Sequence, residues 1–288
     1  MDFNDGARLD TSQVRDARGR GRGLAAGGGG ISIVGLILFL VLGGDPQSLV
    51  QQDPGGSTPG ATSDLAERCA TGADADRDVD CRVVGVVNSV QAYWTGAFER
   101  TNRTYQEADT EIFQGSTTTQ GCGSATSAVG PFYCPADATA YLDLGFFESL
   151  RDDYGASGGP FAVAYVLAHE YGHHVQNLLG TTEKRQRSRD TGPQSVAVRI
   201  ELQADCFAGV WAANAVDTGF LARITEADVK DGLSAAAAVG DDRIQEASTG
   251  RVDQESWTHG SAEQRQTWFL KGYRGKDPGD CDTFTGRV

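Results

Sequence analysis

Histidine is scarce in this chain, basic residues are outnumbered by acidic ones, and the C-x-x-C motif is absent. Four histidines occur in 288 residues, and three of them fall in the stretch "AHEYGHHVQ", residues 168–176. A net charge of −14 argues against nucleic acid as a partner, because a phosphate-binding protein needs a basic surface. No C-x-x-C pair occurs, which argues against a zinc site built from cysteines. The histidine cluster is therefore the first place to look for chemistry.

The six cysteines are an even number, and all of them follow an apolar segment near the start of the chain. This pattern predicts three disulfides formed in an oxidising compartment. Six cysteines allow 15 pairings, and the sequence alone does not choose among them. Close spacing favours Cys69 with Cys81 and Cys122 with Cys134, which leaves Cys206 with Cys281.

The apolar segment covers residues 23–44 and contains no charged side chain. As a helix it would span about 33 Å, enough to cross a hydrocarbon core of roughly 30 Å. Its strongly apolar part, residues 31–42, also suits a cleaved signal peptide, and a buried helix is a third interpretation. No A-x-A-like cleavage site follows, which favours an uncleaved membrane anchor. The N-terminus is then expected in the cytoplasm and the rest outside it, because a cluster of arginines lies just before the segment: Arg15, Arg18, Arg20 and Arg22.

These observations predict four regions. Residues 1–22 are expected to be a cytoplasmic basic tail, 23–44 a transmembrane anchor and 45–64 a flexible linker rich in proline, glycine and serine. Residues 65–288 are long enough, in a chain with 39% apolar residues, to form one globular domain. The predicted protein is therefore a single-pass protein of the cell membrane.

Hydrophobic periodicity predicts an α+β fold class, mostly helical with a small sheet, preceded by the single transmembrane helix. The domain is expected to contain a long helix that begins near Asp80, and β-prone runs that include a hairpin at "YCPADATAY". The edge of such a sheet could pair with an extended peptide. The main helices are expected at 80–105, 159–179, 194–216 and 261–273, and the strands at 110–114, 128–134 and 139–143.

The spacing within "HEYGH" has a chemical meaning if the stretch is helical. His169 and His173 are four residues apart, so they lie on one face and could hold one metal ion. Glu170 lies beside the same face, where its carboxylate could act as a general base toward a water molecule at the metal. This is the H-E-x-x-H arrangement of zinc peptidases. His174 points about 100° away from His173 and is expected to be structural.

A catalytic zinc ion needs a third protein ligand, and the later helix offers one in "ELQAD". Glu201 lies between Ile200 and Leu202, an unusual place for a carboxylate without a cation. Asp205 shares its helix face and could orient a zinc-binding histidine through the other ring nitrogen. We therefore predict His169, His173 and Glu201 as ligands of one Zn²⁺ per chain, with Asp205 behind them.

Six stretches spread over nearly the whole chain make the sequence similar to a family of bacterial neutral zinc metallopeptidases with an N-terminal membrane segment. The histidine motif followed by "ELQAD" also resembles the gluzincin pattern, H-E-x-x-H and then E-x-x-x-D. The resemblance implies a zincin-like fold and peptidase activity. The stretches are "DARGRGRG", "GGDP", "FYCPADATAYLD", "AHEYGHHVQ", "ELQADCFAGVW" and "WTHGSAEQR".

Three further residues have weaker assignments. In gluzincins a distant histidine or tyrosine often donates to the transition-state oxyanion, so the resemblance suggests this role for His259. A buried structural histidine is the alternative. Tyr133 and Tyr141 could line a substrate cleft, although aromatic residues in strands are more often part of the core.

The function that the sequence favours is hydrolysis of peptide bonds outside the cytoplasm by a membrane-anchored zinc metalloendopeptidase. Zinc would acidify the attacking water and polarise the carbonyl, and Glu170 would move the proton to the leaving amine. The expected partners are a peptide or protein substrate and the membrane. Two alternatives remain: a zinc-stabilised binding domain without turnover, and a zinc hydrolase of a non-peptide amide.

Overall fold

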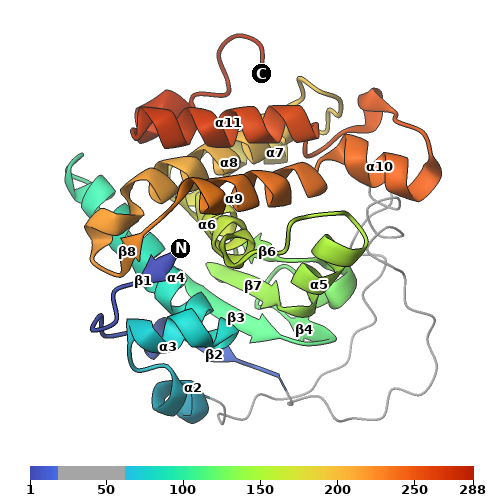
Figure 1. Ribbon diagram of the computed structural model, residues 1–288. Coiled ribbons are helices and arrows are strands. Elements are labelled where there is room, and N and C mark those ends of the chain that lie inside the picture. Colours follow the sequence, from blue (N-terminus) through green and yellow to red (C-terminus); the bar gives the residue numbers. More distant parts are fainter. Residues whose placement is uncertain (19–61) are drawn as a thin grey trace.

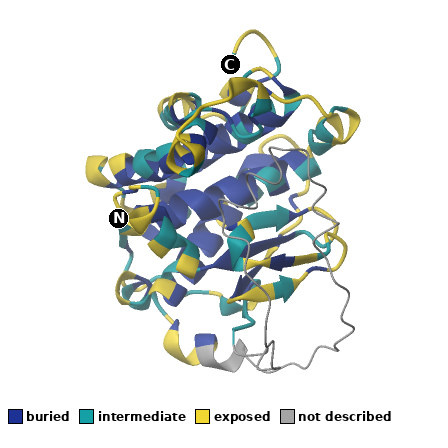
Figure 2. Ribbon diagram, turned by 90° about the vertical axis from the view of Figure 1, so that its right-hand side faces the viewer, coloured by how far each residue is buried: buried dark blue, intermediate teal, exposed yellow. Residues whose placement is uncertain are grey.

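The computed structural model describes residues 1–18 and 62–288, which form helices layered on a small sheet (Figure 1). One helix, α6 (Pro160–Leu178), lies between the sheet and an outer group that includes α8 (Val196–Asn214), α9 (Glu226–Ala238) and α11 (Ala262–Gly275). Figure 2 shows this central helix buried along most of its length. The "AHEYGHHVQ" stretch belongs to α6 and therefore lies at the centre of the molecule.

The main sheet has four strands in the order β2-β3-β7-β6. Strand β3 (Asp109–Phe113) pairs in parallel with both β2 (Val14–Asp16) and β7 (Thr139–Asp143). Strand β6 (Phe132–Cys134) pairs antiparallel with β7 and forms one edge, so the hairpin predicted at "YCPADATAY" is confirmed. Two short antiparallel pairs lie outside this sheet: β1 (Asp2–Phe3) with β8 (Leu221–Arg223), and β4 (Ser116–Thr118) with β5 (Ser124–Thr126).

The remaining helices surround these layers. The longest of them, α4 (Val79–Glu99), packs against α6 and corresponds to the first helix predicted from the sequence. The shorter α-helices are α2 (Thr62–Arg68), α3 (Gly72–Arg77), α5 (Gly145–Asp152), α7 (Thr182–Arg187) and α10 (Asp241–Thr249). Single 3₁₀ turns cover Thr11–Gln13, Ser127–Val129, Ala215–Thr218, Gln254–Ser256 and Pro278–Cys281.

The two helices that carry the predicted metal ligands are held firmly at their starts and against each other. The carboxylate of Asp231, from α9, accepts hydrogen bonds from the backbone N–H groups of Gly159 and Ala162 at the start of α6, at 2.9 and 2.8 Å. Ser195 caps α8 by accepting from the N–H of Val198. A Cβ at Gly172 would lie 2.9 Å from the Cα of Ala204, so the glycine inside "HEYGH" lets α8 approach α6 closely.

The three disulfides suggested by cysteine spacing are confirmed. Cys69 pairs with Cys81 and Cys122 with Cys134, each across 12 residues. The third, Cys206–Cys281, joins α8 to the 3₁₀ turn that follows α11.

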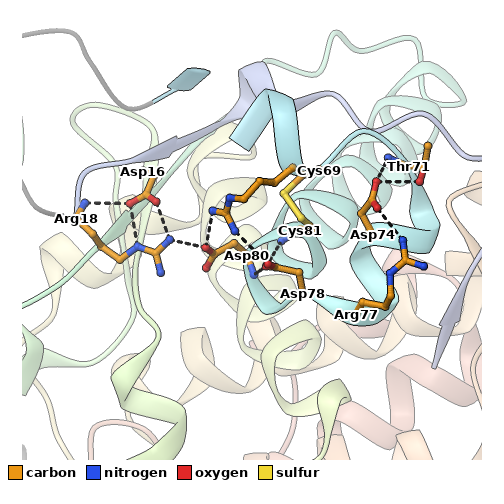
Figure 3. The surroundings of a disulfide bond; sticks show 10 residues. Asp16, Arg18, Cys69, Thr71, Asp74, Arg77, Asp78, Asp80 and Cys81 are labelled. Atoms are coloured by element: carbon orange, nitrogen blue, oxygen red, sulfur yellow. Dashed lines mark hydrogen bonds and ion pairs between the residues drawn. A yellow bond between two sulfur atoms is a disulfide. The ribbon is translucent and has the colours of Figure 1, made fainter. Parts of the chain in front are cut away.

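Residues 1–18 belong to the folded domain, which differs from the predicted separate basic tail. Strand β1 pairs with β8 and β2 completes one side of the main sheet. The side-chain oxygen of Asn88, in α4, accepts a hydrogen bond from the backbone N–H of Asp10 at 2.8 Å. The side-chain nitrogen of Asn88 donates to the backbone carbonyl of Asp10 at 2.9 Å. Around the Cys69–Cys81 disulfide, the guanidinium of Arg18 bonds the carboxylates of both Asp16 and Asp80, each at 2.6 Å (Figure 3). Ion pairs, backbone pairing and packing therefore join this segment to the domain.

The predicted fold class and localisation need correction on one point, the membrane helix. Within residues 1–18 and 62–288, no helix has the length and apolar character needed to cross a bilayer. The segment predicted as an anchor, 23–44, and most of the linker, 45–64, lie outside the described residues. A single crossing between residues 18 and 62 would also put β2 and β3 on opposite sides of the membrane, although they pair in one sheet. The single-pass topology is therefore wrong, and the described fold is a mixed helix-and-sheet domain.

Candidate metal centre

Three predicted ligands come together between α6 and α8. One donor atom from each of His169, His173 and Glu201 lies within 4.8 Å of the others. The Oε2 atom of Glu201 is 3.2 Å from Nε2 of His169 and 3.5 Å from Nε2 of His173. The two imidazole rings are nearly perpendicular, with centroids 4.8 Å apart. Two imidazole nitrogens and one carboxylate oxygen are a donor set that suits Zn²⁺.

Hydrogen bonds to the outer ring nitrogens leave the inner nitrogens free for a metal ion. Nδ1 of His169 lies 2.8 Å from a carboxylate oxygen of Asp205, and Nδ1 of His173 lies 2.9 Å from the side-chain oxygen of Gln176. The Gln176 amide nitrogen donates to the carbonyl of Ile200, which fixes the orientation of its oxygen. Both acceptors therefore place the ring proton on Nδ1, and the lone pair of each Nε2 faces Glu201.

Asp205 is a fully buried carboxylate with three partners. Besides His169, it receives a hydrogen bond from the hydroxyl of Tyr165 at 2.5 Å. Arg265, from α11, contacts both of its oxygens, at 2.8 and 3.0 Å. Burial alone would raise the pKa of Asp205, but the charge of Arg265 and the hydrogen bonds from Arg265 and His169 outweigh it and hold that pKa at about 2. Asp205 therefore stays ionised behind the first histidine.

Glu170 lies beside the three ligands and lines the same pocket. Its side chain is 7% exposed, and its carboxylate has no hydrogen-bond partner among the residues that the structure describes. Burial raises the pKa of this carboxyl above its ordinary value, with a smaller contribution from the neighbouring Glu201. A raised pKa and an uncommitted carboxylate are properties of a group that exchanges protons with a bound molecule.

His259 reaches the same pocket from the loop before α11 and is held there by Asp241. One oxygen of this buried carboxylate accepts the backbone N–H groups of Thr258, His259 and Gly260 at 2.7–2.9 Å. The other oxygen lies 3.3 Å from Nδ1 of His259. Burial would lower the pKa of His259, but the contact with Asp241 raises it. Asp241 thus fixes the orientation of the imidazole that lines the pocket.

The pocket around these residues has a volume of about 420 Å³. The three predicted ligands line it together with residues of β6, α5, α6 and the end of α9. Most of the wall is apolar, because it is built mainly from Val129, Pro131, Phe146, Leu150, Val166, Val239 and Ile244.

The two predicted substrate-binding tyrosines have different positions. Tyr133 lines the pocket, and its hydroxyl points to α6, where it contacts His174 at 2.8 Å. Tyr141 does not line the pocket. Its ring stacks on Phe132 on the other side of the sheet, and its hydroxyl bonds Asp137 at 2.8 Å.

Arg265, Tyr165, Gln176 and Asp241 contact the predicted site residues, and sequence reasoning did not identify them. Gln176 follows His173 by three positions, a spacing that places both on one helix face and gave a local signal. The other three come from distant parts of the chain.

Comparison with known proteins agrees with the chemistry of the donor set. A histidine–histidine–glutamate group that lines a pocket is typical of a metal-dependent hydrolase. The model of the family described as "Putative neutral zinc metallopeptidase" matches residues 4–284, and the chain belongs to this family.

Similar proteins are found in bacteria. "Uncharacterized protein Mb2605" of Mycobacterium bovis is 51% identical over 257 residues, which are 85% of each chain. "Uncharacterized protein YpfJ" of Escherichia coli K12 is 38% identical over 293 residues, 96% of this chain and 97% of the relative. No solved structure matches the chain.

Proposed function

We propose that the protein is a zinc-dependent endopeptidase with a gluzincin-like catalytic site. One observation carries the proposal: the uncommitted, buried carboxylate of Glu170 lies in one pocket with the converging donor atoms of His169, His173 and Glu201. A structural zinc site is normally closed by four protein ligands, and among the described residues three converge here. This ligand number supports a catalytic site with one open position.

Each residue has a defined task in this proposal. A bound Zn²⁺ would act as a Lewis acid that polarises the scissile carbonyl and acidifies the attacking water. Glu170 takes the proton from that water and passes it to the nitrogen of the leaving amine. His259, oriented by Asp241 and protonated on both ring nitrogens, donates a hydrogen bond from Nε2 to the oxyanion that develops at the carbonyl. Asp205 and Gln176 keep the ligand histidines in the required tautomer.

An extended peptide suits the shape of the site. Strand β6 is the last strand of the sheet, so its outer edge offers backbone groups for pairing, and its residues also line the pocket. The apolar wall beyond the metal centre would receive an apolar side chain of such a peptide. The substrate we propose is therefore a peptide or an unfolded protein segment.

The test of this function is the variant Glu170→Gln, which keeps the shape of the side chain and removes the base. The variant should bind about one zinc ion per chain and keep its melting temperature, but lose about two to four orders of magnitude in turnover of a broad peptide library. Glu183→Gln, at an exposed position of α7, is the matched control and should cleave as the wild type does.

Metal removal provides the second arm of the test. Dialysis against a chelator should abolish cleavage by the wild type, and added zinc should restore it. His169→Ala and Glu201→Ala should bind zinc weakly and remain inactive after zinc is added. A zinc-loaded wild type that cleaves no peptide bond in the library would rule out the peptidase and leave the binding domain. Full activity of Glu170→Gln would show that the assigned base is wrong.

A further inference from the structure

The third histidine of the "HEYGHH" stretch faces away from the metal centre, toward strand β6. His174 is 1% exposed and lies between α6 and the sheet. Its Nε2 atom is 2.6 Å from the backbone carbonyl of Gln106, which can only accept a hydrogen bond. The proton therefore sits on Nε2, and Nδ1 accepts a hydrogen bond from the hydroxyl of Tyr133 at 2.8 Å.

Tyr133 is the middle residue of β6 and the one that faces α6. Side chains alternate along a strand, so Phe132 and Cys134 point to the opposite face, where they pack with Phe113 and Tyr141. The Tyr133 hydroxyl also accepts a hydrogen bond from the side-chain amide of Asn177, at 3.3 Å. Two residues of α6 thus hold the edge strand through one hydroxyl.

This connection runs directly to the metal ligands. His173 and His174 are consecutive, so the backbone of α6 carries one imidazole toward Glu201 and the next toward β6. The side chain of Asn177 lies one turn later on the same helix face as His174 (spacing three). The position of β6 relative to the metal centre is therefore set by a rigid, fully hydrogen-bonded imidazole within α6.

We propose that Tyr133 and His174 are positioning residues that fix the substrate-pairing strand β6 at the correct distance from the metal centre. The inference rests on the proposed function. A peptide paired with β6 is placed by the strand, so a small displacement of β6 moves the scissile bond away from Glu170. Misplacement by about 1 Å can cost on the order of a hundredfold in rate.

The variant Tyr133→Phe removes the hydroxyl and keeps the ring that lines the pocket. For a peptide of about ten residues, which can pair with β6, kcat/KM should fall about 10- to 100-fold. For a short blocked dipeptide substrate that spans only the scissile bond, kcat/KM should stay within about threefold, because strand pairing does not place it. Zinc affinity should be unchanged, since no ligand is touched. Tyr273→Phe, outside the pocket and without a hydrogen bond from its hydroxyl in the described residues, should leave both substrates unaffected.

Dependence on substrate length separates positioning from general damage. A merely structural role would lower both activities together, and this outcome, or no loss for either substrate, would overturn the inference. Asn177→Ala is a second variant, which keeps the test valid if Tyr133→Phe folds poorly. It should lower kcat/KM for the long peptide by a smaller factor and leave kcat/KM for the dipeptide nearly unchanged.

A binding assay separates this inference from the proposed function. In zinc-loaded Glu170→Gln protein, adding Tyr133→Phe should weaken binding of the long peptide, measured by fluorescence anisotropy, by about tenfold. If the wild type cleaves neither substrate, the proposed peptidase activity is wrong. The binding assay would still show whether Tyr133 positions β6 for peptide binding. Equal binding by both proteins would overturn it.

Discussion

The carboxylate of Asp205 connects the metal centre to the outer helix layer. It contacts a ligand histidine from α6 on one side and the guanidinium of Arg265 from α11 on the other. The Asp205 carboxylate and the Arg265 guanidinium are both almost fully buried. If one of them is removed, water cannot solvate the charge of the other. Asp205 therefore contributes both to metal binding and to the stability of the domain.

Asp205→Asn should affect both properties. Loss of the charge-assisted bond to His169 should weaken zinc binding by about 10- to 100-fold, measured by competition with a chelator. The buried charge of Arg265 is then uncompensated, so the free energy of unfolding should fall by about 3–5 kcal/mol in urea titrations. Asp152→Asn, at an exposed position, is the control. Unchanged zinc affinity would mean that Asp205 does not orient His169.

Asp241 should show its effect in the pH dependence of stability. Burial opposes its ionised form, but hydrogen bonds with His259 and Gly260 outweigh burial and lower the pKa of Asp241. Its stabilising contribution is therefore present above the unfolded value of about 3.9 and is lost as the pH falls through the lower folded pKa. Urea unfolding should show Asp241→Asn destabilised at pH 7, with the gap to the wild type narrowing below about pH 4. A constant gap would contradict this assignment.

At the residue scale, helical spacing was enough to predict the group that could hold a metal. His169 and His173 share a helix face by their four-residue spacing, and Glu201 was notable because apolar residues flank it. Arg265 lies 60 residues beyond Asp205, and no periodicity links two such positions. The partner of a buried charge depends on how helices pack, which spacing along one helix does not contain.

At the scale of elements, helix α11 packs against α8 with almost no space between their backbones. A Cβ at Gly209 would lie 2.0 Å from the carbonyl oxygen of Phe269, and one at Gly272 would lie 2.0 Å from that of Cys206. Gly209 lies against α11 and Gly272 against α8, and the Cys206–Cys281 disulfide joins α8 to the 3₁₀ turn that follows α11. This contact places Arg265 next to Asp205.

Gly209→Ala should force α11 away from α8. We expect a loss of about 3 kcal/mol or more in the free energy of unfolding, because the clash is with backbone and cannot be relieved by a rotamer change. Weaker zinc binding should accompany it. Gly96→Ala in α4 is the matched control: its Cβ would meet only the end of the Arg100 side chain, at 3.6 Å, so the change should stabilise the protein by about 0.5–1 kcal/mol. Equal stability of both variants would contradict the packing argument.

The sequence predicted most helices and strands correctly by type. It misplaced the ends of the first long helix, which depend on a local capping residue and a local turn. The first long helix was expected from Asp80, but Asp78 is the N-cap and accepts from the N–H of Asp80 at 2.8 Å. The helix ends at Glu99 and not near Tyr105, because the chain turns back at Asn102, which has a positive φ of 54°. Close contacts between helices, such as that of Gly209 with Phe269, could not be predicted. A glycine within a helix does not indicate which other helix packs against it.

At the scale of the whole molecule, residues 1–18 pack into the domain that the later chain forms. The ring of Phe3 is 3% exposed and lies on Gly85 of α4, where a Cβ would come within 2.5 Å of it. Val14, in β2, is 1% exposed. The sequence did not predict this, because the arginines and the apolar run that follows suggested a tail, and the pairing partners of β1 and β2 lie far along the chain.

Phe3→Ala tests whether this segment is structural in solution. Removing a buried aromatic ring should lower the free energy of unfolding by about 3–5 kcal/mol, measured in urea. Val252→Ala, at a residue that is 42% exposed, should change it by less than about 0.5 kcal/mol. If Phe3→Ala is as stable as the wild type, residues 1–18 are not part of the folded unit.

The pairing of β1 with β8 also sets an order for folding during synthesis. Asp2 pairs with Arg223, so β1 cannot find its partner until 221 further residues have been translated. Strand β2 must likewise wait for β3, and both pairings close long loops, which slows folding. Until then Phe3 and Val14 stay exposed to solvent. The nascent chain therefore passes through a period in which its own N-terminal strands are available to chaperones, or to a second nascent copy with which they could exchange.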